Sequence, residues 1–309
     1  MKPPRNIPAL LLALSLCLAL AACSPGGSQT STQPSAPASQ GPSSSTPAQT
    51  PEPAGELADA EIQLFIAASL ENAFQDIIAL YGESQPNITV TYSADSSGTL
   101  LSQIQEGFEC DIFFSAGARQ IDELEQSGLA VDGTRVDLLQ NKVALITYKG
   151  SGTSVTTLSE IGSASSVALA GSSVPVGQYT RAALQALGIL DSGRDAADFT
   201  AQEVSEALGG VEINETANVS ATLNAVAEGS NEVGTVYYSD AYSRIDDVEI
   251  LELVDSSLTG DIIYPMSRVV NPEAGQAQTA AADDFYAFLQ TDAVMDIFER
   301  YLFVSNLEG

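Results

Sequence analysis

Hydrophobic and polar positions alternate with two different periods from residue 61 to the end of the chain. Short segments that are continuously apolar, or apolar at every second position, predict strands at 61–67, 87–92, 111–114, 143–148, 167–170, 232–237, 248–253 and 261–270. Apolar residues at helical spacing predict helices at 71–81, 99–106, 118–127, 177–187, 201–208, 220–228, 276–290 and 292–301. Strands that alternate with helices predict an α/β fold with a parallel or mixed sheet covered on both faces.

The first 22 residues have the pattern of a signal peptide. Lys2 and Arg5 precede an apolar run at 7–22 that is shorter than the ~20 residues of a comfortable transmembrane helix. The run ends in Leu-Ala-Ala-Cys at 20–23, which resembles the lipobox of bacterial lipoproteins. The resemblance implies that Cys23 is lipidated and attaches the protein to the cell membrane, outside the cytoplasm. The alternative is an ordinary secretory signal in which Cys23 is incidental.

A linker is expected at 23–56. Residues 24–56 are almost entirely Ser, Pro, Thr, Gln, Gly and Ala, hold seven of the chain's 14 prolines, and lack aromatic residues, Lys and Arg. Such a segment buries too little apolar area to offset the entropy of ordering it, so it is predicted to be a disordered spacer. The folded part is therefore expected from residue 57 onward.

The composition excludes several classes of function. The chain has 40 acidic and 11 basic residues, a formal net charge of −29, which argues against binding to nucleic acid or to anionic lipid. It has no histidine, so Ser-His-Asp and Cys-His triads and the commonest zinc sites are absent. Cys110 is the one cysteine outside the signal and the lipobox, and it is expected to be a small buried hydrophobe.

Four predicted turns are rich in small or hydroxyl residues, and each comes just before a predicted helix. They lie at 67–70, 96–99, 174–177 and 218–220. In open α/β sheets ligands bind at the carboxyl ends of the strands, where helix N-termini present unpaired N–H groups that suit an anion. Taken singly, Ser69 or Ser97 would be explained as a helix cap. The shared character of the four turns favours an anion site.

Several segments together resemble the molybdate-binding proteins of ABC importers. They are 65–74, 96–104, 111–116, 174–179 and 234–241, followed by closing segments at 285–289 and 297–303. The resemblance covers residues 61–304 in order. It implies a type II periplasmic-binding fold, in which two α/β lobes with mixed sheets surround a ligand cleft. The expected lobes are 57–140 plus 246–309, and 141–245.

The resemblance also implies a set of ligand-binding residues. Ser69 and Ser97 would donate from their hydroxyl and backbone N–H groups, Val176 and Val219 from backbone N–H groups, and Tyr237 from its phenol. A deprotonated molybdate or tungstate dianion only accepts hydrogen bonds, so neutral donors in a closed cleft suit it. No catalytic residue and no cofactor is expected. The implied partners are an ABC permease and its ATPase. The protein is expected to be a monomer that contacts the membrane only through its lipid.

Two charged residues near these turns leave alternatives open. Asp95 stands where the family would have a small neutral residue; it is expected to be a surface acid, but an inward carboxylate would favour a protonated oxyanion such as phosphate or arsenate. Arg181 is expected on a helix surface; the alternative is that its positive charge balances the charge of the anion.

Three other functions compete with molybdate binding. The protein could bind another oxyanion such as phosphate or sulfate, or a small organic acid. It could be an extracytoplasmic hydrolase, or an adhesin or sensor without a ligand.

Overall fold

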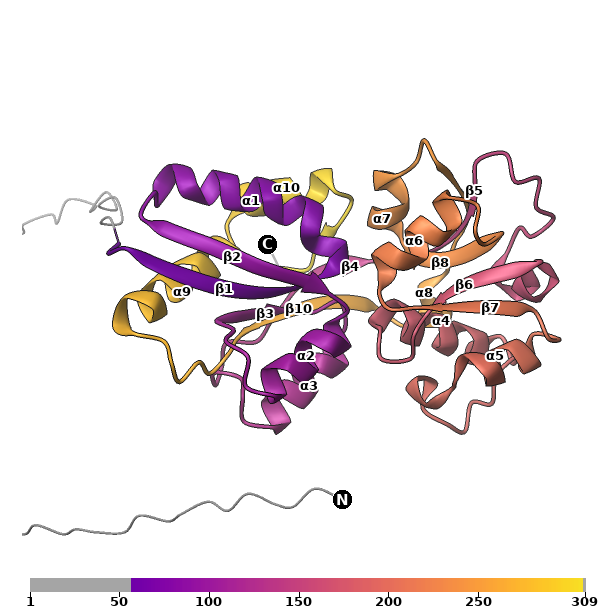
Figure 1. Ribbon diagram of the computed structural model, residues 1–309, viewed down its shortest axis with the longest axis horizontal. Helices are drawn as coiled ribbons and strands as arrows, with labels where there is room; N and C mark the ends of the chain where they lie inside the picture. Colours follow the sequence, from indigo (N-terminus) through magenta and orange to yellow (C-terminus); the bar gives the residue numbers. More distant parts are fainter. Residues whose placement is uncertain (1–56, 308–309) are drawn as a thin grey trace, which may run out of the picture. The chain divides into compact units, whose positions relative to one another are not determined.

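The computed structural model describes residues 57–307, so the expectations for the signal peptide at 1–22, for Cys23 and for the linker at 23–56 lie outside the described residues. Two sheets organise this part of the chain (Figure 1). The first sheet has six strands in the order β11-β4-β10-β3-β1-β2. These strands are β1 (Ala60–Ala67), β2 (Ile88–Asp95), β3 (Ile112–Phe114), β4 (Val136–Asn141), β10 (Ile262–Arg268) and β11 (Val304–Ser305).

The second sheet has five strands in the order β7-β6-β8-β5-β9. They are β5 (Val143–Tyr148), β6 (Ser166–Ala170), β7 (Glu212–Thr216), β8 (Val233–Tyr237) and β9 (Val248–Leu253). Both sheets are mixed: β1 pairs in parallel with β2 and β3, and β6 with β7 and β8, whereas β10 and β5 run antiparallel to their neighbours. The expectation of two α/β lobes with mixed sheets is confirmed.

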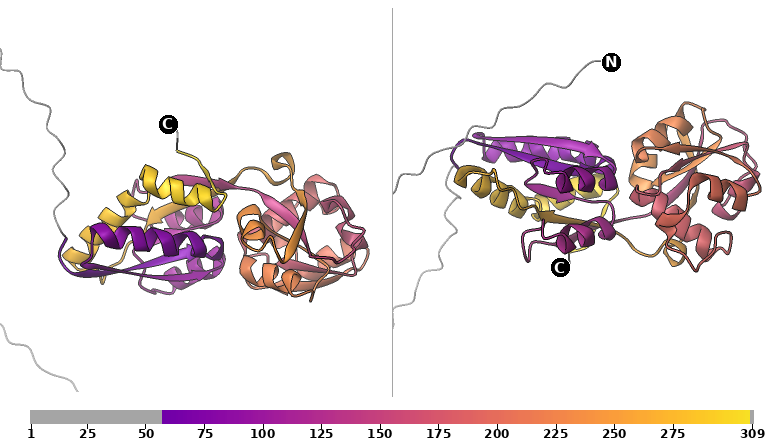
Figure 2. Two further views of the ribbon diagram at one scale, coloured as in Figure 1. Left: turned by 90° about the horizontal axis from the view of Figure 1, so that it is seen from above. Right: turned by 60° about the horizontal axis from the view of Figure 1, so that its bottom comes forward.

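Helices cover both faces of the first sheet, as Figure 2 shows from two further directions. Alternate residues of β1 point to opposite faces, so Leu64 packs in one core with Phe74 and Phe298, while Phe65 packs in the other with Leu100 and Ile121. The helices of this lobe are α1 (Glu71–Ser84), α2 (Ser97–Gln105), α3 (Ala118–Gln126), α9 (Gln276–Phe288) and α10 (Asp292–Arg300). Cys110 is buried in the second of these cores, which confirms its interpretation as a small hydrophobe.

The other lobe carries shorter helices. They are α4 (Pro175–Ala186), α5 (Ala201–Ala207), α6 (Val219–Ala227), α7 (Tyr238–Ser243) and α8 (Ser256–Thr259). Short 3-10 helices occur at Ala68–Leu70, Leu158–Ser163 and Ala196–Asp198. Strands β4, β7 and β11 and helices α7 and α8 have no counterpart among the predicted elements.

The boundary between the lobes differs from the prediction. The expected second lobe ended at residue 245, but β9 pairs with β5 in the second sheet, so this lobe continues until the chain returns to the first sheet at β10. We therefore define lobe 1 as residues 57–141 and 262–307, and lobe 2 as residues 142–261. The strands on either side of the two crossovers are paired: Asn141 lies opposite Ile262, and Ala144 lies opposite Leu253.

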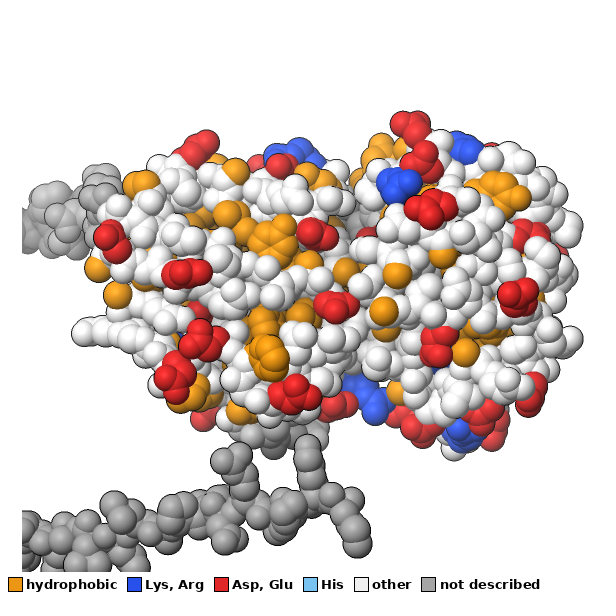
Figure 3. All heavy atoms as spheres, in the orientation of Figure 1, with side chains coloured by type: hydrophobic (Ala, Val, Ile, Leu, Met, Phe, Trp, Pro, Cys, Tyr) orange, Lys and Arg blue, Asp and Glu red, His pale blue; other side chains and the backbone are white. Residues whose placement is uncertain are grey.

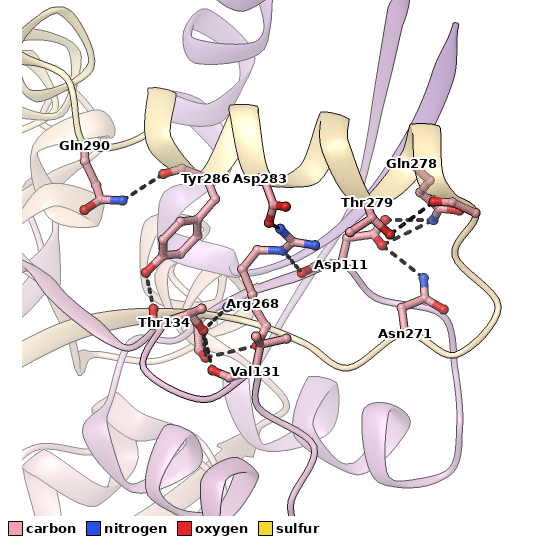
Figure 4. Close-up of polar contacts among 12 residues, drawn as sticks. Asp111, Val131, Thr134, Arg268, Asn271, Gln278, Thr279, Asp283, Tyr286 and Gln290 are labelled. Atoms are coloured by element: carbon pink, nitrogen blue, oxygen red, sulfur yellow. Dashed lines mark hydrogen bonds and ion pairs between the residues drawn. The ribbon is translucent and has the colours of Figure 1, made fainter. Parts of the chain in front are cut away.

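A buried polar cluster joins α9 to the first sheet (Figure 4). The carboxylate of Asp111 accepts hydrogen bonds from the backbone N–H of Gln63 and from the side-chain amides of Asn271 and Gln278. Arg268 donates from Nε to the Asp111 carbonyl and pairs with Asp283 on α9. The two buried charged groups, Asp111 and Arg268, therefore both have partners, as a buried charge requires, whereas the Asp283 side chain is exposed.

Candidate anion-binding site

The lobe 1 side of the site is built where β1 and β2 end. These strands pair in parallel with Ala67 opposite Asp95, so the residues that follow them, Ser69 and Ser97, are brought to the same edge of the sheet. Ser69 lies in the 3-10 turn after β1, and Ser97 is the first residue of α2. Both serines are buried, with 8% and 1% of their surface exposed.

Neither serine caps a helix. The cap of α2 is Ser96, whose Oγ accepts from the Thr99 N–H at 3.1 Å, and the helix after Ser69 has no side-chain cap bond. The Ser97 Oγ instead accepts from the Ala116 N–H at 3.0 Å. Because that oxygen already receives a proton donor, the Ser97 hydroxyl proton remains available for a ligand.

The lobe 2 side of the site consists mainly of backbone. Val176 is the second residue of α4, and Val219 is the first residue of α6, whose cap is Asn218. First-turn N–H groups have no acceptor within their own helix, and they lie at the positive end of the helix dipole. These two helix starts therefore direct N–H groups and positive potential toward the same place.

Tyr237, the last residue of β8, adds a phenol to this half of the site. Its hydroxyl donates to the Ala116 carbonyl of lobe 1 at 3.2 Å, and 1% of the residue is exposed. Burial raises the pKa of Tyr237 well above its usual value, so the hydroxyl stays protonated and remains a hydrogen-bond donor at all physiological pH values.

One cavity between the lobes brings together all five of the predicted ligand-binding residues. Its lining includes Ser69 and Ser97 from lobe 1 and Val176, Val219 and Tyr237 from lobe 2. The cavity volume is about 10 Å³, roughly the space of one water molecule, so a five-atom oxyanion requires the lobes to part or side chains to withdraw. The bond from Tyr237 to Ala116 spans the lobes, and an entering anion could replace its acceptor.

Asp95 lines the same cavity, so the expectation of a surface acid is wrong. Its Oδ1 accepts from the Ser96 N–H at 2.7 Å and from the Asn218 side-chain amide of lobe 2 at 2.9 Å. The carboxylate thus helps to join the lobes and also places an acceptor at the edge of the site. Its orientation depends on Asn218, a contact between residues far apart in the sequence.

Arg181 is buried, so its interpretation as a helix-surface residue is also wrong. None of the residue is exposed, and its guanidinium donates to the carbonyls of Ala170, Gly177 and Phe199 at 2.8 to 3.0 Å. These bonds fasten the end of β6 to the first turn of α4, the turn that carries Val176. Burial lowers the pKa of Arg181, and the nearby carboxylate of Glu215 opposes that shift.

Two residues next to the site were missed by the sequence interpretation. Tyr264 on β10 places its hydroxyl 3.0 Å from the Ser69 Oγ, and the Asn141 amide lies 3.4 Å from the same hydroxyl. Both residues sit where the chain crosses between the lobes, and neither belongs to a recognisable local pattern. Acidic residues are spread over the visible face, with few basic residues among them (Figure 3).

Comparison with known proteins agrees with this geometry. Residues 62–304 match the family model described as "Bacterial extracellular solute-binding protein". The chain belongs to this family. Within it, the solute-binding protein is 30% identical to the molybdate-binding protein ModA of Escherichia coli, over 80% of this chain and 90% of that protein. The resemblance to molybdate-binding proteins of ABC importers is therefore confirmed.

Further similarities support the same assignment. The solute-binding protein is 29% identical, over 78% of its length and 85% of the relative, to the Bacillus subtilis protein named "Putative ABC transporter substrate-binding lipoprotein YvgL". It superposes on the periplasmic molybdate-binding protein of Azotobacter vinelandii with a TM-score of 0.62 and 18% identity, over 80% of this chain and all of that one. This last likeness shows the fold, the two-lobed periplasmic-binding architecture.

Proposed function

We propose that this solute-binding protein captures molybdate, and tungstate equally, in the cavity between its lobes. The observation that carries the proposal is the convergence of Ser69, Ser97, Val176, Val219 and Tyr237 on one cavity. The relatedness to a molybdate-binding protein at 30% identity supports it independently.

The chemistry of these groups suits a fully deprotonated tetrahedral anion. Hydroxyl and backbone N–H groups are neutral donors, and hydrogen bonds to an ionised acceptor are roughly twice as strong as bonds between neutral groups. The net charge of −29 does not prevent binding, because exposed charges are largely screened beyond about 8 Å at physiological salt. The charge should slow capture, so the association rate should rise with salt concentration.

In the proposed role, the protein delivers its anion to an ABC permease and its ATPase without a catalytic step or a cofactor. Lipidated Cys23 would hold the protein at the membrane as a monomer, and the 23–56 linker would allow the folded part to reach the permease. None of the helices in residues 57–307 is both long and apolar enough to cross a membrane.

A calorimetric titration tests the ligand. The chain without its first 23 residues is titrated with molybdate, tungstate, sulfate and phosphate at one pH near neutrality. We expect similar affinities for molybdate and tungstate, which are nearly the same size, and weaker binding of sulfate, which is smaller. Binding of phosphate without any response to molybdate would refute the proposal.

Phosphate is the second candidate ligand because Asp95 lines the cavity. A carboxylate can accept the proton of hydrogen phosphate, whereas it repels a fully deprotonated dianion. The Asp95→Ser variant distinguishes between molybdate and phosphate as the natural ligand. For a molybdate protein it should leave affinity unchanged or improve it, and for a phosphate protein it should weaken binding.

The lipid anchor has a test of its own. Full-length protein expressed in a bacterium should fractionate with membranes and incorporate labelled fatty acid, and Cys23→Ser should abolish both. Incorporation of label by the Cys23→Ser variant would contradict lipidation at this residue.

A further inference from the structure

The first turn of α6 in lobe 2 meets lobe 1 beside the cavity. This helix lies against the 3-10 helix that carries Ser69. Its cap residue, Asn218, donates from Nδ2 to the Oδ1 of Asp95, the last residue of β2, at 2.9 Å. Both residues are half-buried. One side-chain hydrogen bond therefore joins the helix start that carries Val219 to the strand end that precedes Ser97.

The orientation of the Asn218 amide follows from its other hydrogen bond. Its Oδ1 accepts from the Ala221 N–H at 2.9 Å, and a backbone N–H can only donate. The amide atom that faces Asp95 is therefore Nδ2, which needs an acceptor. The Oδ1 of Asp95 also accepts from the Ser96 N–H at 2.7 Å, and this second bond keeps the carboxylate directed toward lobe 2.

The two hydrogen bonds of Asn218 have different effects. The cap orients the first turn of α6 within lobe 2, whereas the bond to Asp95 fixes that turn relative to lobe 1. A hydrogen bond between the lobes exists only while they are closed, and it must break before they part. The bond to Asp95 therefore stabilises the closed arrangement, in which Val219 and Ser97 line one cavity.

Other polar contacts between the lobes are less suited to this task. The Tyr237 hydroxyl donates to the Ala116 carbonyl, but an entering anion could replace that acceptor. Arg119 pairs with Asp195 at 2.8 Å, but 46% and 50% of these side chains are exposed, and exposed ion pairs contribute little. The bond from Asn218 has a carboxylate as its acceptor, and its donor is not among the groups proposed to bind the anion.

We propose that Asn218 is a positioning residue that holds the lobes closed around the anion through its bond to Asp95, and so slows release of the anion. The inference deepens the proposed function and rests on it for the identity of the ligand. An anion enclosed between two lobes leaves after they part, so a bond that opposes parting acts mainly on the dissociation rate. Asp95 alone is a poor place to test this, because its carboxylate also repels a dianion and its substitution changes both effects.

The test compares Asn218→Ser with wild type. Serine caps a helix as well as asparagine does, but it has no amide N–H to donate to Asp95, so the melting temperature should be retained. We expect molybdate affinity to fall about tenfold, mostly through faster dissociation. Calorimetric titration measures the affinity, and stopped-flow tyrosine fluorescence measures the two rates. The matched control is Thr200→Ser, which exchanges the cap of α5 within lobe 2 and should change neither affinity nor rates.

A double-mutant cycle with Asp95→Ala shows whether Asn218 acts through Asp95. In the Asp95→Ala background, Asn218→Ser should have no further effect on molybdate affinity, whereas a general loosening of α6 would persist. Unchanged affinity in Asn218→Ser, or equal effects in both backgrounds, would overturn the inference.

Asn218→Asp provides a second variant in which the cap is kept. An aspartate accepts the Ala221 N–H as asparagine does, but it places a second carboxylate opposite Asp95. We expect it to weaken molybdate binding more than Asn218→Ser does, and to weaken it less in the Asp95→Ala background. Equal losses in the two backgrounds would count against contact between these side chains.

The two proposals fail in different ways. If wild type binds sulfate or phosphate but not molybdate, the proposed function fails, and the cycle measured with the anion that does bind decides the role of Asn218. If wild type binds molybdate and the cycle shows no coupling, the inference fails and the proposed function stands. A wild-type protein that binds none of these anions contradicts both.

Discussion

The two lobes contribute to the cavity in different ways. Lobe 1 offers the hydroxyls of Ser69 and Ser97. The Ser69 hydroxyl is hydrogen-bonded to the Tyr264 hydroxyl, and the Ser97 Oγ accepts from the Ala116 N–H. Lobe 2 offers the first-turn N–H groups of Val176 and Val219, with the Tyr237 phenol as its one side-chain donor. The hydrogen-bond donors of lobe 1 can therefore be removed by substituting single side chains. Most donors of lobe 2 are backbone N–H groups, which can be altered only by changing the side chains that hold that backbone in position.

The two lobes also differ in how fully their buried charged groups are hydrogen-bonded. In lobe 1 the Asp111 carboxylate receives donors at both oxygens, and Arg268 pairs with Asp283. In lobe 2 the Arg181 Nη2 makes no hydrogen bond but lies 3.7 Å from the Glu215 carboxylate, and the Asp240 Oδ2 is buried without a hydrogen-bond partner. Among the described residues, the buried charged groups of lobe 1 are therefore more fully hydrogen-bonded than those of lobe 2, although the Gln120 Oε1 of lobe 1 is also buried without a hydrogen bond.

Removing both lobe 1 hydroxyls should have the largest effect. A hydrogen bond to a charged group contributes about 1.5–3 kcal/mol, so Ser69→Ala with Ser97→Ala should weaken molybdate binding on the order of 10³-fold. The variant should remain folded, with a modestly lower melting temperature because the Ala116 N–H loses the Ser97 Oγ as its acceptor. Calorimetric titration measures the loss. If affinity survives, the side chains of lobe 1 are not the donors.

Arg181→Met tests the scaffold of lobe 2. It leaves three buried carbonyls without their charged donor, so we expect a loss of about 3 kcal/mol in the free energy of unfolding and weaker molybdate binding. The control is Arg244→Met, which removes an exposed ion pair with Asp247 and should change stability by less than about 1 kcal/mol. Denaturant titration distinguishes them, and equal stabilities would contradict a structural role for Arg181.

Asp240 should make the stability of lobe 2 depend on pH. Burial raises the pKa of Asp240 to about 7, above its value in the unfolded chain. The unfolded state then releases this proton first, so stability falls as the pH rises from about 4 to 7. Asp240→Asn should remove about 2 kcal/mol of that decline between pH 5 and 7. Thermal melts of both proteins across this range measure the difference, and parallel curves would show that Asp240 titrates normally.

Gly98→Ala should have the smallest effect and tests contact between the lobes. A Cβ at Gly98 would lie 2.3 Å from the Ser173 carbonyl oxygen of lobe 2, so the methyl group should oppose closure. We expect about a tenfold loss of molybdate affinity, or about 1.4 kcal/mol, without a lower melting temperature. Gly82→Ala on α1 is the control, because nothing lies within 4 Å of its added Cβ. Equal affinities in the two variants would show that this contact does not limit closure.

Local patterns were sufficient to predict most of the strands and helices, whereas the two-lobe arrangement was implied by the family resemblance. The four turns contain most of the residues that line the cavity, but Tyr237 lies outside them and was implied by the resemblance alone. Strand β7, with the sequence Glu-Ile-Asn-Glu-Thr, was missed because its polar residues do not show a strand period. The lobe boundary was placed too early because the partner of β9 is set by pairing across the sheet, which a local pattern does not contain.

The parts of the site that escaped prediction depend on contacts between distant residues. Asp95 is turned toward the cavity by Asn218, and Arg181 is buried because three carbonyls from separate segments surround it. Tyr264 is 195 positions away from the serine that it contacts. For each of these residues the sequence shows the chemical group but not its neighbours, and the neighbours decide its role.

The paired crossovers have a mechanical consequence. The β4–β5 and β9–β10 segments are hydrogen-bonded to each other on both sides of the passage between the lobes, through Asn141 and Ile262 on one side and Ala144 and Leu253 on the other. A two-stranded ribbon bends across its face at little cost, but sliding one strand along the other breaks ladder bonds. We therefore expect this joint to be compliant in one direction and stiff in the others. The lobes should then open and close along a single path that brings their hydrogen-bond donors back to the same relative positions.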